Sequence, residues 1–284
     1  MWLDKKGVHY TTVDLTDRAN INDYAAVKNT ETWRFAPARR ASGGPEKANG
    51  AVEFCRSFFP VIVVVLVLRA WIVEPFRIPS GSMIPTLNVG DFILVNKFTY
   101  GLREPVTHHK VLPWAGSPDR GDVVVFRWPV DPSKDFIKRV IGLPGDRIQM
   151  IDGVLNINGK AVKRERIADY ETFDTYGQAT KVPQYLETLP NGIAHRIIER
   201  DGDNGFWDRT ELYTVPAGHF FMMGDNRDNS TDSRDLANVG FVPFENFVGR
   251  AEMIFFSIDE GTPAWQIWNW PAKVRWGRLF STIH

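Results

Sequence analysis

The sequence predicts a mainly β protein: an antiparallel β body that carries an inserted β-rich lobe and is preceded by one N-terminal transmembrane helix. Three observations predict this architecture. A long apolar run occupies residues 57–73, and short β-rich runs separated by Gly, Pro and Asp fill the chain after residue 75. Asn158-Gly159 also marks a tight β-hairpin with a type I′ turn.

The apolar run SFFPVIVVVLVLRAWIV contains one charged residue, Arg69. As a helix it would be about 25 Å long, close to the roughly 30 Å hydrocarbon core of a bilayer. Arg69 lies near one end, where its head group can reach the lipid head groups, and Trp71 suits the membrane interface. The alternative is a buried strand, because residues 61–68 are all apolar and rich in β-branched side chains. We expect the membrane helix.

The residues around this run predict how it is oriented. No small-x-small cleavage site follows it directly, so we expect a permanent anchor and not a removed signal peptide. Basic residues outnumber acidic ones on its amino side. The acidic residues there are Glu46 and Glu53, and the basic residues are Arg34, Arg39, Arg40, Lys47 and Arg56. This bias predicts a cytoplasmic N-terminus, with everything after Val73 outside the cytoplasm.

Composition excludes several classes of protein. The chain has 34 basic and 34 acidic residues, which argues against a nucleic-acid-binding protein. A single cysteine, Cys55, excludes an intramolecular disulfide and a cysteine-rich zinc site. The HEXXH, P-loop and dinucleotide-binding glycine patterns are missing. We therefore expect neither a metal nor an organic cofactor.

The expected parts of the chain are a tail, a helix, an interrupted β domain and a C-terminal segment. Strands are predicted over 91–98, 122–128 and 136–142, and in the later runs RIQMI, HFFMM and VGRAEMIFFSI. The tail contains a linker-like stretch at 37–50, and the lobe is polar and weakly periodic. The boundaries are 1–56 for the tail, 57–73 for the helix, 74–153 and 212–258 for the β domain, 154–211 for the lobe, and 259–284 for the C-terminal segment.

The C-terminal segment combines tryptophans with basic residues and has no acidic residue after Glu260. This composition favours contact with a membrane interface, and packing against the β core is the alternative. The residues concerned are Trp265, Trp268, Trp270, Trp276, Lys273, Arg275 and Arg278.

Two short segments offer a nucleophile and a base. In 74–87, EPFRIPSGSMIPTL, Ser80 and Ser82 flank a glycine between prolines, so an ordered turn can present a hydroxyl. In 135–146, strand alternation places Lys138 on the same face as Phe136 and Val140. Apolar surroundings lower the pKa of a lysine, and a neutral amine is a general base. The alternatives are serines that only form the turn and a lysine with its head group in water.

A third segment, GDNRDNSTDSR at residues 224–234, concentrates charge in its last ten residues. It holds three Asp, two Arg and two Ser within ten residues, after an apolar strand. A calcium loop would need a glycine and a glutamate that are absent here, and the two arginines would repel a cation. An internal ion-pair network is favoured.

Taken in order, SGSMIPTL, RGDVVVF, KRVIGLPGD and GDNRDNSTDSR resemble the signature motifs of bacterial type I signal peptidases. These are membrane-anchored serine proteases that cut leader peptides from exported proteins, and the similarity spans roughly residues 54–256. The resemblance implies that Ser82 is the nucleophile and Lys138 its general base, with the Ser80 hydroxyl and the Ser82 N–H stabilising the oxyanion. It also implies that Ser230 orients Lys138, that Asp232 pairs with Arg234, and that Asp225 pairs with Arg227 or Arg139.

The resemblance also implies a substrate and a location. Signal peptides of exported preproteins would bind as an added strand and be cut after small residues of the Ala-x-Ala type, at the outer face of a bacterial inner membrane. The lipid bilayer would be a second partner, and nucleic acid would not be one. The subsites would be lined by Phe76, Ile78, Met83, Leu87, Phe136 and Ile137, although alternation points Ile137 away from Lys138.

Other functions remain open at this stage. A catalytically silent, membrane-anchored binding protein can share this fold. A self-cleaving Ser/Lys repressor would carry a DNA-binding domain in place of the anchor. A histidine triad is formally possible, but none of the six histidines belongs to a motif.

Overall fold

The computed structural model describes residues 2–3, 9–10, 50–101, 116–173, 178–259, 268 and 270–284. The chain divides into two units, Met1–Arg56 and Ser57–His284. In the first unit, β1 (Trp2–Leu3) pairs with β2 (His9–Tyr10). The linker expected at 37–50 lies outside the described residues except for its last position.

The expected apolar helix is present as α2 (Gly50–Trp71), which begins earlier than expected and ends sooner. The chain enters β3 at Val73, so the last residue of the expected span lies in a strand. The apolar side chains from Val61 to Leu68 are 39–59% exposed, so they contribute little to a protein core. Among the described residues, no helix reaches both the length and the hydropathy of a membrane-spanning helix.

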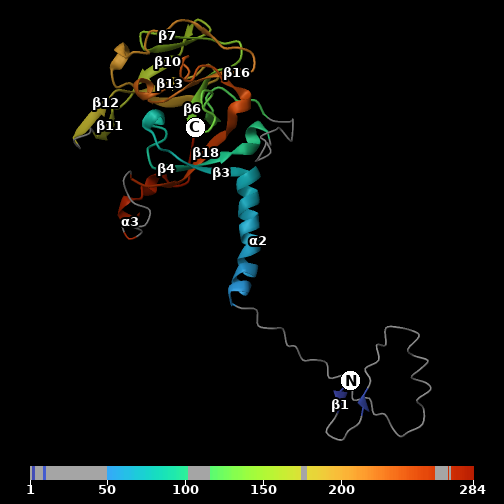
Figure 1. Ribbon diagram of the computed structural model, residues 1–284. Helices are drawn as coiled ribbons and strands as arrows, with labels where there is room; N and C mark the ends of the chain where they lie inside the picture. The colour runs from blue at the N-terminus through green and yellow to red at the C-terminus, as the bar shows by residue number, and fades with distance from the viewer. Residues whose placement is uncertain are drawn as a thin grey trace. The chain divides into compact units, whose positions relative to one another are not determined.

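The body is built on one eight-stranded antiparallel sheet (Figure 1). Its strand order is β17-β16-β6-β5-β18-β4-β3, and β19 pairs with β18. The strands predicted at 91–98, 122–128 and 136–142 are confirmed as β4, β5 and β6. The bounds are β3 (Val73–Arg77), β4 (Asp91–Asn96), β5 (Val123–Arg127), β6 (Asp135–Gly142), β16 (His219–Met223), β17 (Val242–Pro243), β18 (Phe247–Ser257) and β19 (Ser281–Thr282).

Both faces of this sheet are buried in the middle. In β5, Val123 and Val125 enter one apolar cluster, whereas Val124 and Phe126 enter another. Successive side chains of a strand point to opposite faces of the sheet. A strand that is buried on both faces therefore needs a continuous apolar run, as in VVVF of β5. The register pairs Val124 with Lys138, and Val124 shares a cluster with Phe136 and Val140, so Lys138 lies on the predicted face.

Smaller sheets occupy the chain between β6 and β16. One has the order β15-β7-β8-β9, another β10-β13-β14, and a third pairs β11 with β12. Their bounds are β7 (Arg147–Ile151), β8 (Val154–Ile157), β9 (Lys160–Ala161), β10 (Lys163–Arg166), β11 (Tyr170–Phe173), β12 (Ala179–Val182), β13 (Gln184–Thr188), β14 (Ala194–Ile198) and β15 (Tyr213–Thr214).

Tight turns join the first strands of this region. Asn158 and Gly159 both have positive φ, 55° and 77°, which confirms the predicted hairpin between β8 and β9. Asp152 and Gly153 form a second such turn between β7 and β8, with φ of 48° and 73°. This hairpin crosses the expected boundary between residues 153 and 154, because β7 and β8 are neighbours in one sheet.

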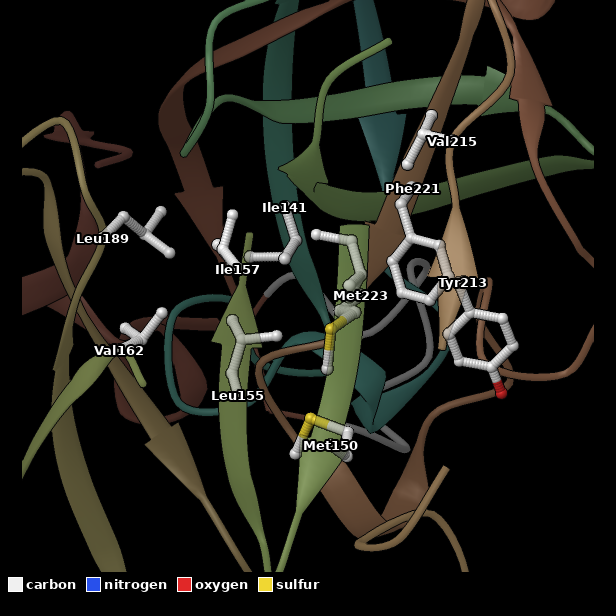
Figure 2. Packing of buried hydrophobic residues seen from close by; sticks show 11 residues of the cluster. Ile141, Met150, Leu155, Ile157, Val162, Leu189, Tyr213, Val215, Phe221 and Met223 are labelled. Carbon is white, nitrogen blue, oxygen red and sulfur yellow. The ribbon is translucent and has the colours of Figure 1, made fainter. Parts of the chain in front are cut away.

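The lobe packs on the body through a shared apolar cluster (Figure 2). Ile141 of β6 and Phe221 of β16 meet Leu155 and Ile157 of the lobe, and the ring centroids of Tyr213 and Phe221 are 5.1 Å apart. The lobe and the sheet therefore share a core.

The C-terminal segment lies against the body. In α3 (Trp270–Lys273), the ring centroid of Trp270 is 5.6 Å from that of Phe256 in β18. After η7 (Trp276–Arg278), β19 extends the sheet. Trp270 and β19 thus pack against the β core, which was the second of the two expectations. Trp268 and Trp276 remain 66% and 64% exposed. Trp265 lies outside the described residues.

Short 3₁₀ helices complete the described chain. They are η1 (Gly81–Met83), η2 (Lys97–Tyr100), η3 (Gly202–Asn204), η4 (Arg227–Asn229) and η5 (Phe244–Asn246).

The crowding around Gly249 gives a test of this strand order. A Cβ at Gly249 would lie 2.5 Å from the Asn96 carbonyl oxygen, so β4 and β18 approach closely there. We expect Gly249→Ala to lower the free energy of unfolding by about 1–3 kcal/mol, as overpacking does. Gly277→Ala is the matched control, because no heavy atom lies within 4 Å of the added Cβ. Urea denaturation of the full chain measures both, and equal effects would contradict the packing.

Candidate active site

Ser82 lies in η1, a turn that is held by the polar loop, the charged segment of residues 224–234. The Asn226 N–H donates to the Ser82 carbonyl oxygen at 3.1 Å, and Asn226 Nδ2 donates to the Gly81 carbonyl oxygen at 2.9 Å. The side chain of Ser82 is buried at 7% relative exposure. Two hydrogen bonds from one residue thus fix the backbone that presents the hydroxyl.

Lys138 of β6 meets this hydroxyl. Lys138 Nζ lies 2.6 Å from Ser82 Oγ and 3.1 Å from the Ile137 carbonyl oxygen, with the Phe136 ring centroid 5.5 Å away. Only 4% of Lys138 is exposed, and this burial lowers its pKa to about 8. Asp232 opposes the shift and Arg234 adds to it. A substantial fraction of the amine is therefore neutral slightly above pH 7 and able to accept a proton.

The two side chains border a cleft of about 400 Å³. Ser80 lines it as well, and its hydroxyl does not cap the short helix that follows, so the hydroxyl is available to a ligand. The lining residues are Pro79, Ser80, Gly81, Ser82, Asp135, Phe136, Ile137, Lys138, Asn229 and Thr231.

The expected subsite residues separate into two groups. Phe136 and Ile137 line the cleft. Strand alternation points Ile137 away from Lys138, but both residues border the cleft. Ile78, Met83 and Leu87 are at most 2% exposed and belong to the core. Phe76 packs against the same core cluster. These four residues do not line the cleft, because the strand and turn that carry them turn their side chains into the protein.

The polar loop forms the expected ion-pair network. Arg139 Nε and Nη2 bind Asp225 Oδ1 and Oδ2 at 2.9 and 2.8 Å, so Asp225 pairs with Arg139, the second of the two partners considered. Arg234 Nε and Nη2 bind Asp232 Oδ1 and Oδ2 at 2.9 and 2.8 Å, as expected. Burial raises the pKa of Asp232, but the charge of Arg234 and the hydrogen bonds to the carboxylate together lower it below its ordinary value. Each pair is bidentate and buried, so the loop is rigidly held.

Arg227 has a partner that the sequence analysis missed. Its guanidinium binds the carboxylate of Glu187 in β13, with Nη1 3.1 Å from Oε2. Burial raises the pKa of Glu187, but the charge of Arg227, together with His195 and the hydrogen bonds to the carboxylate, brings that pKa to about 2. This pair joins the polar loop to the lobe.

Ser230 was expected to orient Lys138 through a hydrogen bond, but this bond is not found. Ser230 is buried at 8% exposure, and its Oγ forms no hydrogen bond with Lys138 in the part of the chain that the structure describes. It packs instead on Gly224, where an added Cβ would lie 2.2 Å from Ser230 Oγ and 2.6 Å from the Ser82 carbonyl oxygen. The expected hydrogen bond from Ser230 to Lys138 is therefore not found, and the small size of Gly224 leaves the space that Ser230 occupies beside the Ser82 turn.

Other contributors were also missed. Thr86 donates its hydroxyl to Asp225, and His195 Nε2 lies 3.4 Å from Glu187 Oε1. Burial lowers the pKa of His195, and none of the histidines that the structure describes lines the cleft; His108 and His109 lie outside the described residues. Asn226 and Thr86 lie within the motifs that the sequence analysis singled out, whereas His195 lies in none.

A serine hydroxyl beside a buried amine, in an open cleft, is typical of serine hydrolases in which lysine replaces histidine. The family described as "Signal peptidase, peptidase S26" matches residues 51–256. The chain therefore belongs to the signal peptidase family S26.

Two relatives from Pseudomonas agree with this assignment. "Signal peptidase I" of Pseudomonas aeruginosa is 48% identical over 249 residues, covering 78% of this chain and 84% of that protein. "Signal peptidase I" of Pseudomonas fluorescens is 50% identical over 218 residues, covering 74% of each. A solved signal peptidase I of Enterococcus faecalis is 25% identical and covers 47% of this chain and 96% of its own, with a TM-score of 0.28. The chain is a serine endopeptidase that removes signal peptides.

The pair between Arg227 and Glu187 gives a prediction on stability. Glu187→Gln leaves a buried guanidinium without its counter-charge, which should lower the free energy of unfolding by about 3–5 kcal/mol. Glu165→Gln, which breaks the exposed pair with Lys163, should cost at most about 1 kcal/mol. Urea denaturation compares the two, and similar small losses would show that the lobe is not held by this pair.

Proposed function

We propose that Ser82 is the nucleophile of this signal peptidase and Lys138 its general base. The distance of 2.6 Å between Ser82 Oγ and a buried lysine amine carries the proposal. Neutral Lys138 takes the hydroxyl proton as Oγ bonds to the scissile carbonyl carbon, and then returns that proton to the leaving amine as the peptide bond breaks. Lys138 next deprotonates a water that attacks the ester, which releases the acid and restores Ser82.

The oxyanion needs donors at the mouth of the cleft. We assign this role to the Ser82 N–H and the Ser80 hydroxyl. Ser80 is exposed in the cleft and its hydroxyl is not engaged in capping η1, which supports the assignment.

The cleft also suits an extended peptide. Residues 135–139 of β6 pair with β5 on one side, whereas β16 pairs with β6 only from Arg139 onward. The second edge of Asp135–Lys138 thus lacks a strand partner in the described chain and faces the cleft. A signal peptide can add there as a strand, with its small Ala-x-Ala side chains against Phe136 and Ile137. Ile78, Met83 and Leu87 would then support these walls from the core.

We infer that α2 anchors the enzyme in the bacterial inner membrane, with the N-terminus in the cytoplasm and the catalytic domain outside. The exposure of eight consecutive apolar residues, 61–68, supports this inference, because such a surface is unfavourable in water. The basic residues before the helix support the orientation.

The proposed base predicts the effect of a single substitution. Lys138→Arg keeps a positive charge, but a guanidinium stays protonated at any working pH, so cleavage of a peptide with an Ala-x-Ala site should fall by at least about 10³-fold. Thermal unfolding monitors retention of the fold. Lys134→Arg is the control, because Lys134 is exposed and pairs with Asp131. A folded Lys138→Arg protein with activity within tenfold of wild type would refute the dyad.

The oxyanion assignment predicts different effects for two substitutions at one position. Ser80→Ala should lower kcat by about 10²–10³-fold with little change in KM, because the hydroxyl acts only when charge develops on the carbonyl oxygen. Ser80→Thr keeps the hydroxyl and should retain far more activity. Steady-state kinetics on one peptide distinguish the two roles of Ser80. Mild and equal losses would mean that it only shapes the turn.

The orientation can be tested with fusions. A reporter that is active only outside the cytoplasm should give signal when fused after Leu87 and none when fused before Ala51. The opposite pattern would reverse the proposed orientation, and signal from neither fusion would mean that the chain does not cross the membrane.

A further inference from the structure

Three carboxylates from separate parts of the chain lie close together, two from the lobe and one from the polar loop. Glu199 follows β14, Asp208 follows η3, and Asp228 lies in η4. One oxygen of each lies within 4.8 Å of those of the other two. Glu199 and Asp208 are buried, at 0% and 1% exposure.

Glu199 enters this cluster without the partners that a buried carboxylate needs. Neither of its carboxylate oxygens accepts a hydrogen bond, and Asp208 Oδ1 accepts none either. Glu199 forms one long ion pair among the described residues, with Arg164, whose Nη1 lies 3.7 Å from Glu199 Oε1. Arg164 donates instead to Asp203 Oδ1 at 2.7 Å and to the Gly153 carbonyl oxygen at 2.9 Å. A buried carboxylate of this kind is costly unless a counter-charge reaches it.

The other nearby arginines are already engaged. Arg227 binds Glu187, and Arg234 binds Asp232. Neither donates a hydrogen bond to the three clustered carboxylates within the described residues. Arg227 and Arg234 thus each bind an acid of their own, and their charges offset only part of the effect of burial, which raises the pKa of Glu199 to about 8.

We propose that Glu199, Asp208 and Asp228 together bind one Ca²⁺ ion. The ligands are all carboxylate oxygens, which hard cations prefer, and no histidine or cysteine belongs to the cluster. Oxygens up to 4.8 Å apart fit an ion with metal–oxygen distances of 2.3–2.6 Å. Ca²⁺ also tolerates the irregular geometry of ligands from three segments, whereas Mg²⁺ requires a closer octahedral arrangement.

The local sequence could not indicate this site. Only Asp228 comes from the charged motif 225–234, whose spacing is not that of a calcium loop. The other two ligands come from the lobe. The ion would tie the end of the lobe to η4, which carries the cleft residue Asn229. This role is structural and goes beyond the peptidase activity.

Thermal unfolding of the full chain, purified in detergent micelles, tests the proposal. After chelation, Ca²⁺ is titrated from 0.01 to 10 mM at constant ionic strength, and Mg²⁺ is titrated in parallel. At about 100 times its Kd, Ca²⁺ should raise the midpoint by roughly 5–10 °C, and Mg²⁺ should have a smaller effect. Isothermal titration calorimetry with Ca²⁺ should show one site.

Two variants locate the site. Glu199→Gln and Asp228→Asn should each abolish the response to Ca²⁺. Glu171→Gln removes the same charge from an exposed position of the lobe and should keep the full response. A wild-type protein with no Ca²⁺-dependent shift would overturn the proposal, as would a response that survives in both cluster variants. If the variants fail to fold, the wild-type calorimetry alone decides, and absence of binding overturns the site.

Discussion

The contact between Ser82 Oγ and Lys138 Nζ is the constraint on which the rest of the structure depends. An amine can act as a base near neutral pH only if its charged form is destabilised, and here burial supplies that destabilisation. The cost of placing a lysine in an apolar setting must be offset elsewhere. The double burial of the central sheet offsets it, since β5 and β6 pack apolar side chains on both faces around Lys138.

The polar loop holds the turn that carries Ser82, and its charged side chains do not line the cleft. Asn226 binds the backbone of the turn, while Asp225 binds Arg139, the residue next to Lys138 on β6. The loop thus helps to position both Ser82 and Lys138. Its charges are paired within the protein, so Lys138 is buried near Asp232 and Arg234 without a net charge that would restore its usual pKa. Buried pairs of this kind favour specific geometry more than stability.

The sequence predicted the parts that depend on local pattern. The strand at 136–142 and the hairpin at Asn158 follow from apolar runs and turn residues, and the motif order indicated Ser82 and Lys138 before any geometry was known. Contacts between distant polar residues could not be predicted. Glu187 and His195 lie in weakly periodic strands, and nothing local shows that their side chains point into the protein. The subsite residues divide for a related reason: an apolar residue near a serine fits a core as well as a pocket, so Phe136 lines the cleft whereas Met83 lies in the core.

The pH dependence of kcat/KM tests the central claim most directly, because it reports the ionisation of the free enzyme. With a peptide substrate that does not titrate between pH 6 and 10, kcat/KM should rise tenfold per pH unit at low pH and level off with an apparent pKa of about 8. A profile that keeps rising to the ordinary lysine value near 10.5, or one that is flat across this range, would contradict a buried lysine as the base.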